Sequence, residues 1–433
     1  MSLRPYLLSS LLALTAAGCG EDPAPEQPVQ EPLPDVPALT PDDPGHLAVA
    51  QRGVALDGDD LAVITGTEQP VGVTAARLQS EFGLLVLNRP YADWQATRCP
   101  RSTEADNVQP RAKSEDILDD LAGAGIEFDR IAVNVSLLTP GQRALQYICF
   151  DESGSAPRFD VLEHRREIIE AFTDLAGLPG IAYITVGVEM NRYYHLTGED
   201  GDRLVDDYSN FMSLYREVYH AVKAENPDVQ VGPGISWAVF HRLTMPELAA
   251  DLDLEPTSLD AAVAAWRRTV RPMLSEGRGA DRAPTADFLG VTMIPFDGEA
   301  PWNGEAASDD PTRQAELYEA FRWLPLLVGA GTADEIPLVM PVVDWAEQSG
   351  AAGAKKGPFL ATLKAATSVL DVEWLAWRRL STLPDEPPEA NPCRKYVSNN
   401  DPALRYAPSY CNSGLLDESG SRRSVWDELL TAP

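Results

Sequence analysis

Basic residues are scarce in this chain. Its 433 residues include 35 Lys and Arg against 66 Asp and Glu, which gives a formal net charge of −31. A polyanion of this size is repelled by phosphate backbones, so nucleic acid is not expected as a partner. Docking onto anionic lipid headgroups by charge is disfavoured for the same reason. The charge is compatible with neutral or cationic ligands and does not by itself select a function.

The N-terminal apolar run is too short to cross a bilayer. The run from Leu7 to Ala17 follows one early positive charge and fits the apolar segment of a secretory signal. It ends in Ala16-Ala17-Gly18-Cys19, which resembles a bacterial lipobox. The resemblance implies that residues 1–18 are a lipoprotein signal and that Cys19 carries the lipid. The alternative is an ordinary signal peptide cleaved nearby.

The segment 19–44 lacks the composition needed to build a core. Proline and acidic residues dominate it, which predicts an extended, disordered linker. A lipid on Cys19 and this tether would hold the folded part close to a membrane. We therefore expect an exported, monomeric protein that is lipid-anchored to a bacterial membrane, at the outer membrane or the cell surface.

Cysteine and histidine are also few, with five of each. If Cys19 takes the lipid, four cysteines remain, an even number in an oxidising compartment. We expect two disulfide bonds, Cys393 with Cys411 and Cys99 with Cys149. The cysteine spacings do not resemble those of zinc sites. The sequence therefore predicts neither a metal centre nor a cofactor.

Apolar runs of strand length alternate with amphipathic runs of helix length from about residue 82 onward. This alternation is typical of parallel strands joined by helical crossovers, and eight units predict the α/β class with a single (β/α)₈ TIM barrel over 82–433. Residues 45–81 are expected to form an N-terminal extension that packs on the barrel. The eight predicted strands are 83–88, 130–135, 145–150 (weak), 181–189, 229–237, 288–296, 336–344 and 373–377.

An open, doubly wound sheet is the competing architecture. Such a sheet carries a glycine-rich turn after its first strand, where the ligand phosphates would bind. The predicted first strand is followed instead by Asn88-Arg89-Pro90-Tyr91, which contains no glycine. The sequence therefore favours the barrel.

The active sites of (β/α)₈ barrels lie at the carboxyl ends of the strands, so candidate residues are expected there. Glu189 is the ninth residue of predicted strand four, and Asp344 is the ninth of predicted strand seven. Two carboxylates that face each other across a sugar are the minimal equipment for glycoside hydrolysis. For Glu189, the alternatives are a surface position or a salt bridge with Arg192. For Asp344, the alternative is a helix N-cap.

Aromatic and polar residues gather at the same predicted ends. Indole rings offer flat apolar faces on which sugars can stack. The tryptophans on or just after predicted strands are Trp94, Trp237, Trp302, Trp345, Trp374 and Trp377, of which two or three are expected to be core. The i, i+3 spacing of the last two allows at most one to point inward. Polar groups at strand ends are Asn88, Tyr91, Asn134, Ser236, Asp297 and Glu373, and His241 follows close behind.

Several motifs resemble the clan A glycoside hydrolases, a group of retaining (β/α)₈ enzymes that includes cellulases and endo-β-1,4-galactanases. Gly187-Val188-Glu189-Met190-Asn191-Arg192-Tyr193 is similar to the G-N-E-x-N-x-Y signature that ends strand four in that group. Residues 286–296 and 414–420 resemble its strand-six and final-turn motifs. The resemblance covers about residues 82–430 and implies that Glu189 is the acid/base. The predicted substrate contacts are then Asn88, Tyr91, Asn134, Asn191, Tyr193, Trp237, Trp302, Trp345, Glu373 and Trp377.

The chain departs from this group at two important positions. Val188 replaces the Asn that precedes the acid/base, and the nucleophilic Glu of strand seven is absent before Trp345. Asp344 would substitute with a shorter side chain, or Glu347 or Glu373 would reach in, or the retaining chemistry is lost. Two functions stay open: a glycoside hydrolase for β-linked saccharides at the cell surface, and a catalytically inactive, carbohydrate-binding lipoprotein.

Overall fold

The structure is a computed structural model, and all its described residues belong to the compact unit Pro34–Pro433. They are 47–56, 75–91, 110–138, 158–196, 204–277, 282–293, 296–297, 300–301, 321–344, 356–378, 380, 414–416, 422–423 and 425–427. Several predictions fall outside these residues and stay predictions. They concern Cys19, Cys99, Cys149, Cys393, Cys411, Trp94, Trp302, Trp345, Glu347 and the Asp297 side chain. The prediction that 145–150 forms the third barrel strand is wrong, because β3 at 131–136 pairs directly with β4 at 181–186 in a ring closed by eight other strands.

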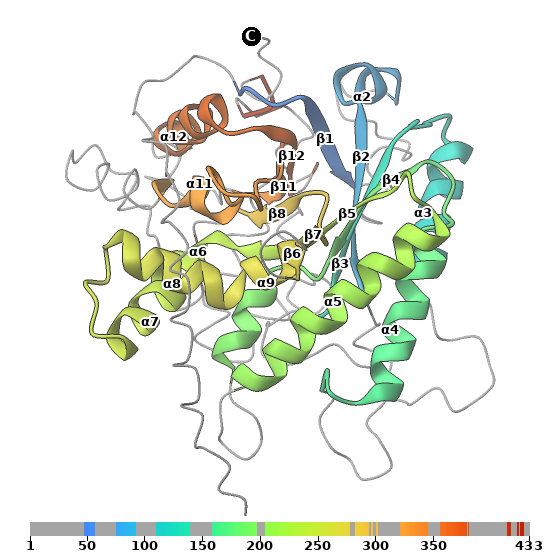
Figure 1. Cartoon of the computed structure of the whole chain (residues 1–433). Coiled ribbons are helices and arrows are strands. Elements are labelled where there is room, and N and C mark those ends of the chain that lie inside the picture. The colour runs from blue at the N-terminus through green and yellow to red at the C-terminus, as the bar shows by residue number, and fades with distance from the viewer. Residues whose placement is uncertain are drawn as a thin grey trace, which may run out of the picture. The chain divides into compact units, whose positions relative to one another are not determined.

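Eight parallel strands close into a barrel (Figure 1). Each strand pairs in parallel with its neighbours in the order β1-β12-β11-β8-β5-β4-β3-β2. This closed ring confirms the TIM barrel predicted from the alternating pattern. The strands are β1 (Gln51–Leu56), β2 (Leu84–Pro90), β3 (Ile131–Ser136), β4 (Ile181–Val186), β5 (Gln230–Ser236), β8 (Leu289–Thr292), β11 (Leu338–Val343) and β12 (Val372–Trp377).

The first barrel strand lies earlier in the chain than predicted. β1, at Gln51–Leu56, falls inside the segment that the sequence analysis placed ahead of the barrel, and it pairs with both β2 and β12. The run predicted as strand one is therefore the second strand, and the run predicted as strand two is the third. From strand four onward the predicted and observed numbers agree. The prediction of a separate N-terminal extension over 45–81 is therefore wrong for residues 51–56, which belong to the barrel.

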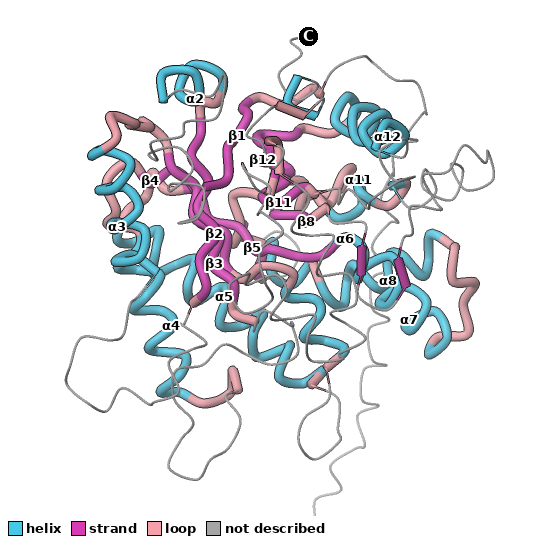
Figure 2. Tube along the Cα trace, turned by 180° about the vertical axis from the view of Figure 1, so that it is seen from behind, coloured by secondary structure: helices cyan, strands magenta, loops and turns pink. Residues whose placement is uncertain are grey.

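Helices follow most of the strands. They bury one side, as α4 shows with Ile168, Ala171, Phe172 and Leu175 at helical spacing. Both views show α3, α4 and α5 side by side along the outer face of the strands (Figures 1 and 2). No described helix is both long and apolar enough to cross a membrane. The longer helices are α2 (Ala75–Glu81), α3 (Pro110–Gly123), α4 (Leu162–Leu175), α5 (Val205–Glu225), α7 (Met245–Asp251), α8 (Leu259–Thr269) and α12 (Lys356–Val369).

Short elements complete the connections between strands. A 3₁₀-helix, η1 (Met190–His195), follows β4, and a π-helix, η2 (Phe240–Thr244), lies between α6 and α7. Two-residue strands form the pairs β6–β7 and β9–β10 beside the barrel. The remaining bounds are α6 (Trp237–Val239), α9 (Arg271–Leu274), α11 (Leu324–Leu327), β6 (Ser275–Glu276), β7 (Ala283–Pro284), β9 (Phe296–Asp297) and β10 (Ala300–Pro301).

The core has two layers. A large cluster fills the space between strands and helices, and a smaller one fills the barrel interior. The inner cluster contains the rings of Tyr183, Phe288 and Trp374, whose centroids lie 5.5–6.0 Å apart in two contacts. Gly232 on β5 leaves room for the Phe288 ring, which a Cβ at that position would overlap. Side chains therefore fill the half of the barrel interior that lies at the amino ends of the strands, as in other small closed barrels.

Candidate active site

Glu189 lies three residues beyond the end of β4 and is 2% exposed. Its backbone, with φ of 57° and ψ of 32°, occupies the left-handed region that residues other than glycine rarely adopt. Arg192 Nε donates to Glu189 Oε2 at 2.9 Å, and Arg192 Nη2 donates to Oε1 at 3.4 Å. The salt bridge considered from the sequence is thus present, but it holds a buried carboxylate rather than a surface one.

Hydrogen bonds and an ion contact hold both the start and the end of η1, the helix that follows Glu189. Asn191 Nδ2 donates to the Ser236 carbonyl at 2.8 Å, and the Ser236 N–H donates to Asn191 Oδ1 at 2.7 Å. Further along, His195 Nε2 lies 3.0 Å from Thr244 Oγ1, and His195 Nδ1 lies 2.9 Å from a Glu247 carboxylate oxygen. These contacts join the loop after β4 to the elements after β5. They fix the backbone that presents Glu189.

Asp344 follows the last residue of β11 directly and is fully buried. Arg378, the residue after β12, donates from Nη1 to Asp344 Oδ2 at 3.2 Å. The backbone N–H of Asp344 donates to the Met293 carbonyl at 3.2 Å, and that of Arg378 donates to the Val343 carbonyl at 2.9 Å. These bonds continue the ladders of β11 past the strand ends. Asp344 is thereby fixed at the carboxyl end of the seventh strand.

Both carboxylates therefore belong to one end of the barrel. Parallel strands that close into a ring bring all their carboxyl ends to the same rim, and Glu189 and Asp344 follow the fourth and seventh strands. Beneath this rim, Asn134 Nδ2 on β3 reaches the Pro341 carbonyl on β11 at 3.4 Å. Because β3 and β11 are not neighbours, this bond crosses the interior.

Asn88 and Asn134 lie next to each other on β2 and β3, as the pairing register requires. Asn134 Nδ2 donates to Asn88 Oδ1 at 2.9 Å. Asn134 is 1% exposed, whereas Asn88 is only partly buried. Of these two predicted contacts, Asn88 is the more accessible, and Asn134 holds its side-chain oxygen from the neighbouring strand.

Glu373 is not at this rim. It is the second residue of β12, at the amino end of the strand, and Tyr183 Oη donates to its Oε1 at 2.5 Å. Arg130, just before β3, donates from Nη2 to Tyr183 Oη at 2.6 Å. The prediction that Glu373 contacts substrate or replaces the nucleophile is therefore wrong. A strand has two ends, and Glu373 starts the predicted strand rather than closing it.

Trp374 and Trp377 face opposite sides of β12, as their spacing predicts. Trp374 belongs to the inner cluster near the barrel bottom, and Trp377 packs between strands and helices. Tyr91 also lies in that outer layer, where burial and then Glu167 and Glu170 of α4 raise the pKa of its hydroxyl. Neither Trp377 nor Tyr91 is placed to meet a substrate, so these two predicted contacts are wrong.

Asn191, Tyr193 and Trp237 are nearly or fully buried in the protein. Asn191 is occupied by the Ser236 backbone, and Tyr193 donates its hydroxyl to Asp207 at 2.6 Å. Trp237 stacks on His241, with centroids 6.2 Å apart and an interplanar angle of 15°. These residues shape the loops after β4 and β5. The structure gives them supporting contacts instead of the direct sugar contacts that were predicted.

Two partners of the site were not predicted. Arg378 pairs with Asp344, and Asp207 of α5 accepts the Tyr193 hydroxyl. A signal for Arg378 exists in the sequence, since it directly follows strand eight and so lies at the same end as Asp344. Within the described residues, no group of three or more His, Cys, Asp or Glu is placed to hold a metal ion.

No protein-family profile and no curated protein matches the sequence. Solved structures are similar at low identity. An exo-β-1,4-mannosidase from Opitutaceae bacterium strain TAV5 aligns with a TM-score of 0.53 and 13% identity, over 90% of this chain and 60% of that one. GH5_18 from Streptomyces cattleya, in complex with GlcNAc, aligns with a TM-score of 0.50 and 13% identity, over 89% and 79%.

A third structure is a variant of GH5_18 from Bifidobacterium longum subsp. longum ATCC 55813 in complex with Manβ1-4GlcNAc. It aligns with a TM-score of 0.52 and 12% identity, over 82% of this chain and 70% of that one. The present chain thus spans less than two thirds of the mannosidase. These similarities show the fold: the chain has the barrel found in clan A glycoside hydrolases, as the motifs predicted.

Proposed function

We propose that the chain is a glycoside hydrolase that cleaves a β-linked saccharide. The observation that supports this most is the pair of buried carboxylates, Glu189 and Asp344, which follow the fourth and seventh strands of a closed parallel barrel. Each is held by an arginine that fixes its orientation. Burying a charged carboxylate is costly, and here the ion pairs with arginine offset that cost. Two such buried carboxylates at the same end of the barrel support a shared role in catalysis.

In this proposal Glu189 is the acid/base. It protonates the glycosidic oxygen as the bond to the anomeric carbon breaks, and the aglycone leaves as an alcohol. Asp344 either attacks the anomeric carbon, forming a glycosyl ester that water then cleaves while Glu189 takes the proton of that water, or deprotonates the attacking water in a single displacement. Carboxyl groups about 5–5.5 Å apart give the first route with retention, and about 6.5–9.5 Å gives the second with inversion. Among the predicted contacts that the structure describes, Asn88, partly exposed beside Asn134, is the best placed for a sugar hydroxyl.

The names of the similar structures support a choice of first substrates. One acts on β-1,4-mannosides and another was solved with Manβ1-4GlcNAc. We therefore put β-mannosides ahead of β-glucosides, β-galactosides and β-xylosides. The proposal also includes export and a lipid anchor on Cys19. Fractionation tests this part, because Cys19→Ala should move the protein from the membrane fraction to the soluble one.

A second candidate is a barrel that binds glycans without cleaving them. Two departures favour it: Val188 stands where an amide is expected, and Asp344 is one methylene shorter than the usual nucleophile. Reacting atoms must be held about 3–3.5 Å apart, so one methylene can decide whether turnover occurs.

The two candidates are separated by a glycan-array screen followed by hydrolysis assays on the glycans that bind. The first predicts release of new reducing ends by the wild type and loss of release in Glu189→Gln and Asp344→Asn, with both variants still folded at the assay temperature by circular dichroism. Glu373→Gln is the matched control, since this carboxylate lies at the opposite rim and should be dispensable for turnover. Binding without release by the wild type would favour the second candidate.

A further inference from the structure

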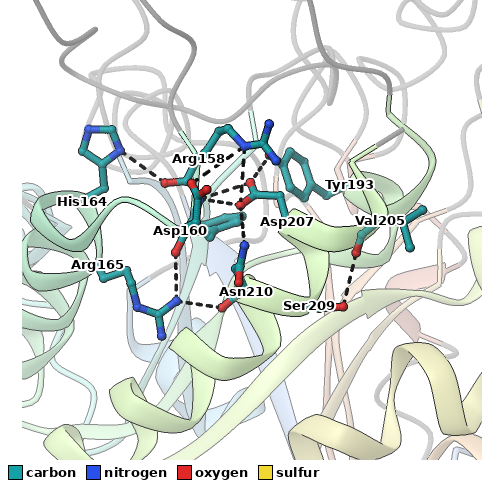
Figure 3. A network of polar contacts seen from close by, with 10 residues as sticks. Arg158, Asp160, His164, Arg165, Tyr193, Val205, Asp207, Ser209 and Asn210 are labelled. Atoms are coloured by element: carbon teal, nitrogen blue, oxygen red, sulfur yellow. Dashed lines mark hydrogen bonds and ion pairs between the residues drawn. The ribbon is translucent and has the colours of Figure 1, made fainter. Parts of the chain in front are cut away.

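Asp207 is a fully buried carboxylate that the proposed reaction does not use. It lies in the first turn of α5, and both its oxygens accept hydrogen bonds (Figure 3). The Phe159 N–H lies 3.0 and 3.1 Å from the two oxygens, Tyr193 Oη donates at 2.6 Å, and Asn210 Nδ2 donates at 3.3 Å. Arg158 Nε lies 3.9 Å away and adds a weaker ion pair.

These partners come from two successive connections of the barrel. Phe159 lies just ahead of α4, at the end of the connection that begins after β3, and Tyr193 lies in η1 after β4. Their rings also meet edge to face, with centroids 5.4 Å apart. We call the contacts of Phe159 and Tyr193 with Asp207 the junction. Arg165 supports it, because its Nη1 donates to the Phe159 carbonyl at 2.9 Å and to the Asn210 carbonyl at 3.0 Å (Figure 3).

The junction acts on the backbone that presents Glu189. η1 begins directly after Glu189, and the Arg192 N–H donates to the Glu189 carbonyl at 2.9 Å. The left-handed conformation of Glu189 is unfavourable for this residue type and persists only where surrounding contacts enforce it. Asn191 holds the start of η1 and Asp207 holds its middle through Tyr193. Without the second contact, η1 loses this hydrogen bond to α5 and keeps ring packing such as that of Tyr194 on Tyr208, with centroids 5.7 Å apart.

We propose that Asp207 is a positioning residue for Glu189: by holding Tyr193 it fixes η1 and so the direction of the Glu189 carboxylate. The catalytic part of this statement rests on the proposed function, whereas the structural part does not. A carboxylate is needed because every close partner is a donor. An amide at this position would either turn its NH₂ group toward the Phe159 N–H and the Asn210 NH₂, which cannot accept, or reverse the bond to Tyr193, whose hydroxyl would then accept instead of donating.

The test compares Asp207→Asn and Tyr193→Phe with a matched control, Asp334→Asn. Asp334 is also fully buried, and it accepts from Arg271 Nε at 2.9 Å, Arg282 Nη1 at 3.2 Å and Ser275 Oγ at 2.6 Å. It precedes β11, so it lies at the amino end of the strands. All variants are full-length and are assayed well below their melting temperatures, by hydrogen exchange and by hydrolysis of the oligosaccharide that the wild type cleaves fastest, since a sugar leaving group needs the proton of Glu189.

Asp207→Asn is expected to increase amide exchange in the peptide over residues 187–196 about ten-fold or more. It should lower kcat by about 10²-fold and leave KM within about two-fold, since a displaced acid/base affects the reaction more than binding. Tyr193→Phe should change both quantities in the same direction and by less. Asp334→Asn should lower the melting temperature without changing exchange over 187–196 or kcat.

Unchanged exchange over 187–196 in both Asp207→Asn and Tyr193→Phe would overturn the proposal. Equal losses of kcat in Asp207→Asn and Asp334→Asn would also overturn it, because they would report general destabilisation. If the wild type cleaves no glycoside, the proposed function fails and hydrogen exchange alone decides whether Asp207 positions η1. If Asp207→Asn does not fold, Tyr193→Phe carries the same comparison.

Discussion

At the scale of single residues, the backbone of Glu189 is the most informative feature. Its φ of 57° is unusual for a glutamate, and among the described residues other than glycine only Asp253, with φ of 55°, shares a positive φ. Such strain tends to collect where a protein needs a side chain in one direction. Glu189 is buried at the candidate site, whereas Asp253 lies in the connection between α7 and α8.

The left-handed strain is best measured at Asp253, because its side chain is exposed and its removal leaves no cavity. Asp253→Gly should stabilise the protein by about 1 kcal/mol, since glycine adopts this conformation without strain. Urea denaturation measures the gain, and activity should be retained. An unchanged or lower stability of Asp253→Gly would contradict the strain.

The sequence predicted part of the site because strand ends can be located from apolar runs. Glu189 and Asp344 each close such a run, and the structure places both after strand ends. Glu373 was misplaced because it begins a run, and a parallel strand puts its start at the opposite rim. Arg378 and Asp207 escaped prediction because their roles depend on partners 34 and 14 residues away, Asp344 and Tyr193.

At the scale of elements, β5 depends on glycine for its close approach to the loop after β4. A Cβ at Gly234 would overlap the Gly187 carbonyl oxygen, which is backbone and has little freedom to move. Gly123, at the end of α3, has open space around the same position. Close packing therefore requires glycine at position 234 in β5, whereas no neighbouring atom requires glycine at position 123 in α3.

Alanine substitutions at these two glycines should act in opposite directions. Gly234→Ala should destabilise the protein by about 1–3 kcal/mol, because a packed site has no room for the added methyl group. Gly123→Ala should stabilise it by about 0.4–1 kcal/mol, since alanine restricts the unfolded chain and fits a helix. Chemical denaturation measures both. A neutral Gly234→Ala would show that the loop after β4 can shift, which conflicts with a fixed Glu189.

The strand that the sequence missed shows the limit of local patterns. β1 has six residues, as β4 and β11 do, but it begins with Gln51 and Arg52 and its apolar run, residues 54–56, is only three residues long. Its membership in the barrel is set by pairing with β12, more than 300 residues away, as in the register Gln51 with Trp374. Nothing in the composition of residues 51–56 reveals that partner. The runs of β4 and β11 were predicted because they are apolar over almost their whole length, the pattern expected of strands buried on both faces.

At the scale of the whole molecule, tyrosines are held protonated by the fold. Burial raises the pKa of Tyr208 and Tyr215 above the ordinary value near 10, and burial followed by Asp287 raises that of Tyr219 to about 12. The folded state therefore keeps protons that the unfolded state releases above about pH 10. This contribution is fully present below pH 10 and is lost as pH rises toward and beyond 12.

An alkaline titration should consequently show cooperative behaviour. The buried tyrosines should ionise together with unfolding, so near-ultraviolet tyrosinate absorbance and loss of circular dichroism should coincide above about pH 10. In denaturant the same residues should titrate near pH 10. Tyr219→Phe should weaken the dependence of stability on pH between about 10 and 12. Free titration of every tyrosine near pH 10 in the folded protein would contradict the burial described.

Glu189 and Asp344 are proposed to act on the same glycosidic bond, and a double variant tests this most directly. We expect Glu189→Gln and Asp344→Asn each to lower kcat/KM on the best oligosaccharide by about 10²–10⁴-fold. Combining them should lower it little further, because groups that act as one unit are strongly non-additive. Losses that multiply in the double variant, or single variants that retain activity, would contradict the claim.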